Sequence, residues 1–152
     1  MFVSLTRARI RQPWFAPAFA WYAVRAFTQA QAASGFHDGS VLRDRRLTFW
    51  TMTAWDDISS MRAYMLSGPH QDAMPRMANW CDEASVTHWE EDGPGLPTWP
   101  EAERRMRTQG RASKLRHPSL NHADLSFSPA RTTTSAPMPR TAGSQKRRPR
   151  DL

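Results

Sequence analysis

Residues 47–55, LTFWTMTAW, constrain the fold of this chain more than any other stretch. Aromatic and β-branched residues fill it, which is typical of a β-strand, where successive side chains point to opposite faces. Phe49 and Trp55 lie on one face, and Trp50 and Met52 lie on the other. A strand that is apolar on both faces belongs in the centre of a sheet that is covered on both sides. Helices on one face alone cannot provide this cover, so a second subunit is expected on the other face.

The rest of the first 95 residues alternates between strand and helix patterns. The predicted elements are a strand at residues 2–10, a helix at 14–33, two strands within 37–55 joined by a turn at 43–46, a helix after Asp57, a helix from Pro69 and a strand at 83–91. The order βαββαβ predicts an α+β, ferredoxin-like domain with one antiparallel sheet and helices on one face. Because proline removes a helical hydrogen bond, we expect the last helix to kink or split at Pro75.

The C-terminal part of the chain has a different composition. Residues 1–100 carry a net charge of −1, whereas residues 101–152 carry +8. A short basic helix is predicted at 99–109, and beyond it Ser, Thr, Pro and Arg dominate, which is typical of disorder. The predicted organisation is therefore a domain at 1–95, a helical extension at 96–117 and a disordered basic tail at 118–152. A basic tail can attract nucleic acid or anionic lipid, but such runs are usually solvated, and we expect no specific nucleic acid and no membrane partner.

The cellular compartment is indicated only by general features. The chain has one cysteine, Cys81, so it can form no internal disulfide. Its first residues, MFVSLTRARIRQPW, lack the continuous apolar run of a signal peptide, and no stretch is apolar enough to span a membrane. We expect a cytoplasmic protein.

Two stretches carry a family resemblance. TAWDDISSMRAYMLSGPHQDAM, which begins at Thr53, resembles the segment of antibiotic biosynthesis monooxygenase-like domains in which a strand ends in Trp and a helix leads to Ser-x-x-His. NWCDEASVTHWEEDGPGLPTWPEAERRMRTQGR resembles an uncharacterised branch of the same superfamily. The resemblance implies a dimeric α+β barrel, so the protein would be a homodimer whose two sheets pack face to face. It also implies an apolar pocket between sheet and helices, where some relatives oxidise aromatic polyketides without metal or flavin.

Another branch of this superfamily degrades haem, and the resemblance to it is incomplete. Where those relatives have their haem-ligating His, this chain has Met74, and the first strand offers Ser4 and Thr6 in place of Asn. Haem is therefore disfavoured, and we expect no cofactor.

His70 is the candidate catalytic residue. It shares a helical stripe with Met74 and Trp80, and a neutral imidazole can accept a proton from a bound phenol or orient it. The alternative is a histidine that caps a neighbouring carbonyl. The predicted substrate-binding residues are Trp50, Trp55, Tyr64, Met74 and Trp80. Aromatic residues also dominate cores and interfaces, so plain packing is the alternative for this set.

Other reactive side chains lack a recognisable pattern. His37 and His88 show no metal-ligand spacing with His70, so no metal site is expected. Acidic neighbours of Cys81 disfavour a thiolate nucleophile. Three hypotheses remain: a small cofactor-independent oxygenase that binds an apolar or aromatic molecule, a non-catalytic ligand-binding or structural dimer of the same fold, and an accessory protein that acts through its basic tail.

Overall fold

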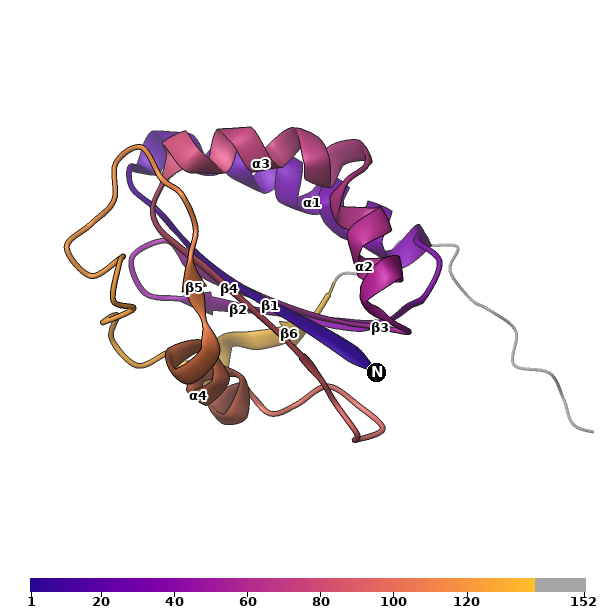
Figure 1. Ribbon diagram of the computed structural model, residues 1–152. Coiled ribbons are helices and arrows are strands. Elements are labelled where there is room, and N and C mark those ends of the chain that lie inside the picture. The colour runs from indigo at the N-terminus through magenta and orange to yellow at the C-terminus, as the bar shows by residue number, and fades with distance from the viewer. Residues whose placement is uncertain (139–152) are drawn as a thin grey trace, which may run out of the picture.

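The computed structural model describes residues 1–138, in which one antiparallel sheet has helices on both faces (Figure 1). The elements are β1 (Phe2–Ile10), η1 (Pro13–Phe15), α1 (Ala16–Ala32), β2 (Phe36–Asp44), β3 (Thr48–Trp55), α2 (Ile58–Met65), α3 (Gly68–Trp80), β4 (Cys81–Glu90), α4 (Trp99–Gln109), β5 (Arg111–Ala112), η2 (Thr132–Thr134) and β6 (Ser135–Pro137). The strand order is β5-β4-β1-β3-β2-β6. The predicted α+β class and the βαββαβ core are confirmed, and β5 and β6 extend the sheet beyond the four predicted strands.

The helices α1, α2 and α3 lie on one side of the sheet, and α4 lies on the other (Figure 1). We call these the helix face and the α4 face. Strand pairing assigns residues to them: Thr6 of β1 lies opposite Thr51 of β3 and Val86 of β4 on the helix face. Leu5 lies beside Met52 on the α4 face. The predicted alternation along β3 is confirmed, because Trp50 packs on the α4 face and Trp55 on the helix face.

Local sequence signals begin and end the helices as expected. Pro17 lies in the first turn of α1, where a missing N–H costs nothing. Asp57 caps α2, its carboxylate accepting the backbone N–H of Ser60 at 2.8 Å. The expected split at Pro75 does not occur, because α3 runs from Gly68 to Trp80 as one helix. Burial of Trp80 anchors the second half of this helix.

The α4 face holds a closed apolar core. Its members come from the sheet, from α4 and from the segment that follows: Val3, Leu5, Leu42, Trp50, Met52, Ala54, Trp89, Ala102, Met106 and Phe127. Side chains of the helical extension therefore share one core with the first 95 residues. The strand β3 is apolar on both faces, and α4 and the segment that follows it cover its α4 face. This cover comes from the same chain and not from a second subunit. The homodimer stays a prediction, but an uncovered sheet face no longer supports it.

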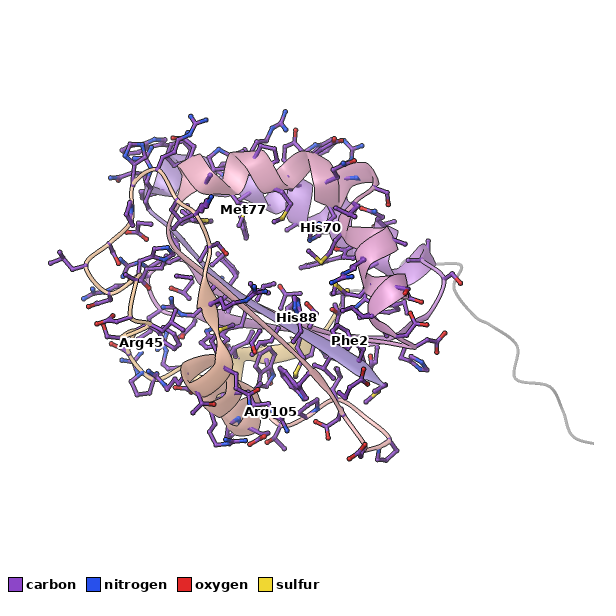
Figure 2. The ribbon with its side chains drawn as sticks, viewed as in Figure 1. Phe2, Arg45, His70, Met77, His88 and Arg105 are labelled. Atoms are coloured by element: carbon purple, nitrogen blue, oxygen red, sulfur yellow. The ribbon has the colours of Figure 1, made fainter. Side chains whose placement is uncertain are left out.

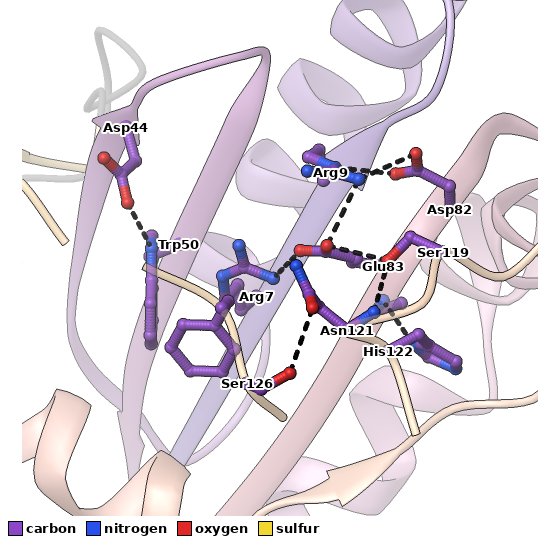
Figure 3. A network of polar contacts seen from close by, with 12 residues as sticks. Arg7, Arg9, Asp44, Trp50, Asp82, Glu83, Ser119, Asn121, His122 and Ser126 are labelled. Atoms are coloured by element: carbon purple, nitrogen blue, oxygen red, sulfur yellow. Dashed lines mark hydrogen bonds and ion pairs between the residues drawn. The ribbon is translucent and has the colours of Figure 1, made fainter. Parts of the chain in front are cut away.

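A buried polar network attaches the covering segment, residues 113–130, to the sheet (Figure 3). The Arg7 guanidinium donates to Glu83 at 2.6 Å, and Ser119 donates to the other oxygen of Glu83 at 2.8 Å. Arg9 pairs with Asp82 at 2.8 Å. The guanidinium of Arg7 also lies 4.1 Å from the ring centroid of Phe127. Paired charges and a cation–π contact make burial of these arginines acceptable.

The predicted disorder from residue 118 onward is wrong for residues 118–138. Phe127 and Met138 are both buried, at 4% exposure each, and β6 pairs with β2. Two buried apolar residues are enough to order this polar segment. The sheet offers an apolar face to Phe127, and the edge of β2 pairs with β6. The basic run at 146–150 lies outside the described residues. Within residues 1–138, no helix is both long and apolar enough to cross a bilayer.

Candidate ligand cleft between the sheet and the helices

The two faces of the sheet differ in how completely they are buried. On the α4 face, Val3 and Leu5 of the central strand β1 have no exposed surface. On the helix face, Thr6 of the same strand is exposed, and its partners Thr51 and Val86 are only half-buried. A residue in the centre of a sheet, beneath helices, can be exposed only if solvent reaches between the two layers. A cleft therefore separates the sheet from the helices.

Hydroxyl groups form the floor of this cleft. Thr6 and Thr51 lie side by side, and the next row places Ser4 between Thr53 and His88. Thr53 accepts the indole N–H of Trp55 at 2.9 Å. The hydroxyls of Thr6 and Thr51 make no hydrogen bond within the described part of the chain. They are free to donate to or accept from a bound molecule.

The helix α3 forms part of the roof. His70, Ala73, Met77 and Trp80 recur at helical spacing, and all are half-buried or buried. Figure 2 shows His70 and Met77 on the side of α3 that faces the sheet, with His88 on the sheet below them. Methionine adapts its shape to irregular or flat apolar ligands. Met74 lies off this stripe and is 49% exposed, so it does not line the cleft.

His70 is held in one orientation by its neighbours. Its backbone N–H donates to Oε1 of Gln29 at 2.9 Å, and its ring Nδ1 lies 3.2 Å from the carbonyl oxygen of Met65. A ring nitrogen next to a carbonyl must carry the proton, which leaves Nε2 as the acceptor. Burial lowers the pKa of His70, although the bond to Met65 opposes this shift. The ring is therefore neutral at neutral pH and has no partner for Nε2 among residues 1–138.

Three of the predicted site residues come together. The rings of Trp55 and Tyr64 are stacked at 5.0 Å, and Tyr64 lies 4.7 Å from His70. Trp55 has no exposed surface, and the Tyr64 hydroxyl donates to the carbonyl of Ala26 at 3.3 Å. Burial raises the pKa of Tyr64. These two rings support His70 from behind rather than offering a free face to a ligand.

The other predicted residues lie elsewhere. Trp50 is on the α4 face, where its ring meets Phe127 edge-on at 5.5 Å. Trp80 lies at the far end of α3 against Tyr22, with ring centroids 5.7 Å apart. Residues on opposite faces of one strand cannot line one pocket, so Trp50 does not belong to the predicted site.

His88 is the residue that sequence reasoning underrated. It lies half-buried on the helix face, its ring 5.8 Å from Phe2, and its Nε2 is buried without a hydrogen-bond partner in residues 1–138. Burial lowers its pKa, and the charges of Arg111 and Arg62 lower it further. The sequence pattern of β4 could have placed His88, because its alternation with the apolar Trp89 puts the two side chains on opposite faces of the strand. Gln29 was also missed, since nothing local marks a glutamine on α1 as a contact to α3.

Other candidate sites have less chemistry to offer. A groove on the outer surface between α1 and α2 has a volume of about 620 Å³ and is lined mostly by serines and alanines. Cys81 is buried, and burial raises its thiol pKa to about 12, which disfavours a thiolate. In the described range 1–138, no three His, Cys, Asp or Glu side chains gather as a metal site.

The comparisons with known proteins agree with this architecture. A family model described as Domain of unknown function (DUF3291) matches residues 8–114. A putative antibiotic biosynthesis monooxygenase from Nitrosomonas europaea is 14% identical, with a TM-score of 0.55 over 62% of this chain and 93% of that chain. NE2512, a protein of unknown function from the same organism, is 21% identical, with a TM-score of 0.53 over 63% and 93%.

A third structure, Rv0793 from Mycobacterium tuberculosis, is 10% identical, with a TM-score of 0.55 over 62% of this chain and 100% of that chain. At such identities the likeness shows the fold alone. No protein of curated function matches the chain.

Proposed function

We propose a function for this chain from its cleft, because the chain belongs to the DUF3291 family, whose function is unknown and whose model matches residues 8–114. The protein binds an apolar or aromatic small molecule between the sheet and α1–α3. The observation that carries this proposal is the open helix face of the sheet. Thr6 is exposed there, while the opposite face of the same strand is sealed. A protein that only needed a stable core would fill this space as it fills the other face.

We further propose that the bound molecule is oxidised without a cofactor. The neutral His70 presents Nε2 as a base, and Met65 fixes its tautomer. Removal of a proton from a phenol-like substrate yields an electron-rich anion that reacts with O₂. When a ring CH₂ becomes C=O, one oxygen atom enters the product and the other leaves as water, and the substrate supplies all the electrons. Such a reaction needs no external reductant.

Anthrone tests this proposal, since it has such a CH₂ group. We expect the protein to raise oxygen uptake with anthrone above the uncatalysed rate, and His70→Gln to lower the enzymatic rate by about 100-fold, the usual contribution of a general base. His37→Gln is the matched control, because His37 is exposed and pairs with Asp56 at 2.5 Å, away from His70. Equal rates for wild type and His70→Gln would refute the role of His70.

A non-catalytic binding protein of the same fold is the second candidate. It is favoured by the finding that Trp55 and Tyr64 are used for packing rather than for contact with a ligand. This candidate predicts that a neutral probe, 2-naphthamide, binds without any oxygen uptake from anthrone. Failure of both 2-naphthamide and its carboxylate analogue 2-naphthoate to bind would overturn both candidates.

A further inference from the structure

One side of the cleft, at the β4 edge of the sheet, carries two arginines. Arg111 of β5 pairs with Val86 of β4, so its side chain leaves the sheet on the helix face, next to the cleft floor. Arg62 follows the buried Met61 on α2 and is exposed. Both charges act on the ring of His88, whose pKa they lower. Arg111 and His88 lie on the same face at this edge of the sheet, and the charge of Arg62 on α2 reaches His88; we call this place the β4 mouth.

Neither arginine is neutralised by an acidic side chain of the described residues. Within residues 1–138, Arg62 and Arg111 form no ion pair, whereas Arg7, Arg9, Arg104, Arg105 and Arg107 all do. Glu90 lies on the same face of β4 two residues beyond His88, but it is exposed and forms no ion pair either. The charge at the β4 mouth is therefore positive and unpaired.

On the opposite side, Met138 covers one end of the cleft. There β6 lies along β2, and Met138 packs against Gly39 so closely that a Cβ at Gly39 would come within 3.0 Å of its terminal methyl group. Met138 also joins the apolar cluster of Phe2, Trp55 and Met61.

We propose that the ligand is an anion, an aromatic carboxylate whose acid group lies between Arg62 and Arg111 beside His88, while its ring extends toward Thr6 and Met77. This inference rests on the proposed function, because it names the class of molecule that the cleft takes. Arginine is suited to the role, since its planar guanidinium matches the geometry of a carboxylate.

Two probes of the same shape test the charge preference. The affinities of 2-naphthoate and 2-naphthamide for the full chain are measured by fluorescence titration at low and high salt. We expect naphthoate to bind about fivefold more tightly at low salt and to lose this advantage at high salt, as partly exposed ion pairs do. The double variant Arg62→Gln/Arg111→Gln should lose the preference and keep its affinity for naphthamide. Arg45→Gln, an equal charge change in the β2–β3 turn far from the mouth (Figure 2), should behave as wild type.

The outcomes separate this inference from the proposed function. Equal affinity for both probes, or a preference that survives in the double variant, would refute the anionic ligand and leave the cleft intact as a binding site. A preference that Arg45→Gln also abolishes would show that net charge, not the β4 mouth, is responsible. Failure of both probes to bind would refute the cleft itself and with it the inference.

Discussion

His70 and His88 are the residues whose protonation links the cleft to stability. Burial lowers the pKa of each ring in the folded chain. As the pH falls below the ordinary value of 6.5, the unfolded chain therefore takes up protons before the folded chain does. The stability that these histidines contribute is complete above that pH and is lost as the pH drops through it.

Urea unfolding at about pH 7.5 and about pH 5.5 tests this linkage. We expect the free energy of unfolding to be lower at the acidic pH, and the double variant His70→Gln/His88→Gln to show a smaller decrease. An identical pH dependence in the double variant would contradict the linkage.

Cys81 allows a second test at the level of a single residue. Its side chain is fully buried, and its pKa is raised to about 12. We expect no reaction with a disulfide reagent at about pH 8 in the folded protein and complete reaction in urea. Rapid labelling of the folded protein would show that the end of α3 opens readily.

At the scale of elements, Gln29 joins α1 to the junction between α2 and α3. Its amide nitrogen donates to the carbonyls of Tyr64 and Ser67 at 3.0 and 2.7 Å, and its oxygen accepts from the backbone of His70. Gln29→Ala should cost about 2 kcal/mol of unfolding free energy, because three partners lose their bond at a half-buried place. Thr28→Ala, on the exposed side of the same helix, should cost less than about 0.5 kcal/mol in the same urea titration.

Gln29→Ala should also loosen the roof of the cleft. We therefore expect weaker binding of 2-naphthamide by Gln29→Ala and unchanged binding by Thr28→Ala. Equal stability of the two variants would show that the junction is held by packing alone.

The elements of the core could be predicted because their signals are local. Alternation along β3 and the cap at Asp57 each act over a few residues. The unbroken helix at Pro75 could not be predicted, since burial of Trp80 outweighs the lost hydrogen bond. For the site, strand alternation was sufficient to put Trp50 and Trp55 on opposite faces of β3, yet both were assigned to one predicted pocket. The contacts of His70 with Gln29 and Met65 depend on how two helices cross, which no local pattern encodes.

At the scale of the whole molecule, Phe127 ties the covering segment, residues 113–130, to the sheet. It is 4% exposed and lies over the guanidinium groups of Arg7 and Arg107, at 4.1 and 4.3 Å. Phe127→Ala should cost about 3 kcal/mol, as expected for truncation of a buried phenylalanine. Leu120→Ala, at a fully exposed position of the same segment, should cost almost nothing.

Light scattering on these variants addresses the predicted homodimer. Loosening of the segment uncovers the α4 face, so we expect Phe127→Ala to self-associate more strongly than wild type or Leu120→Ala. If wild type is a dimer and Phe127→Ala is a monomer, the segment itself would build the interface. Sequence patterns missed this segment because two apolar residues in a polar stretch resemble disorder until the surface that receives them is known.

Two short strands in the segment after α4 lie at the two edges of the sheet. β5 pairs with β4 and β6 pairs with β2, so one stretch of chain occupies both margins of the sheet. Strands at a margin carry unpaired backbone groups that can template fibril growth from other molecules. A chain cut after Gly110 would leave the strands β2 and β4 unpaired at both margins at once. Pairing by residues 111–112 and 135–137 thus keeps parts of both margins from joining the strands of other molecules.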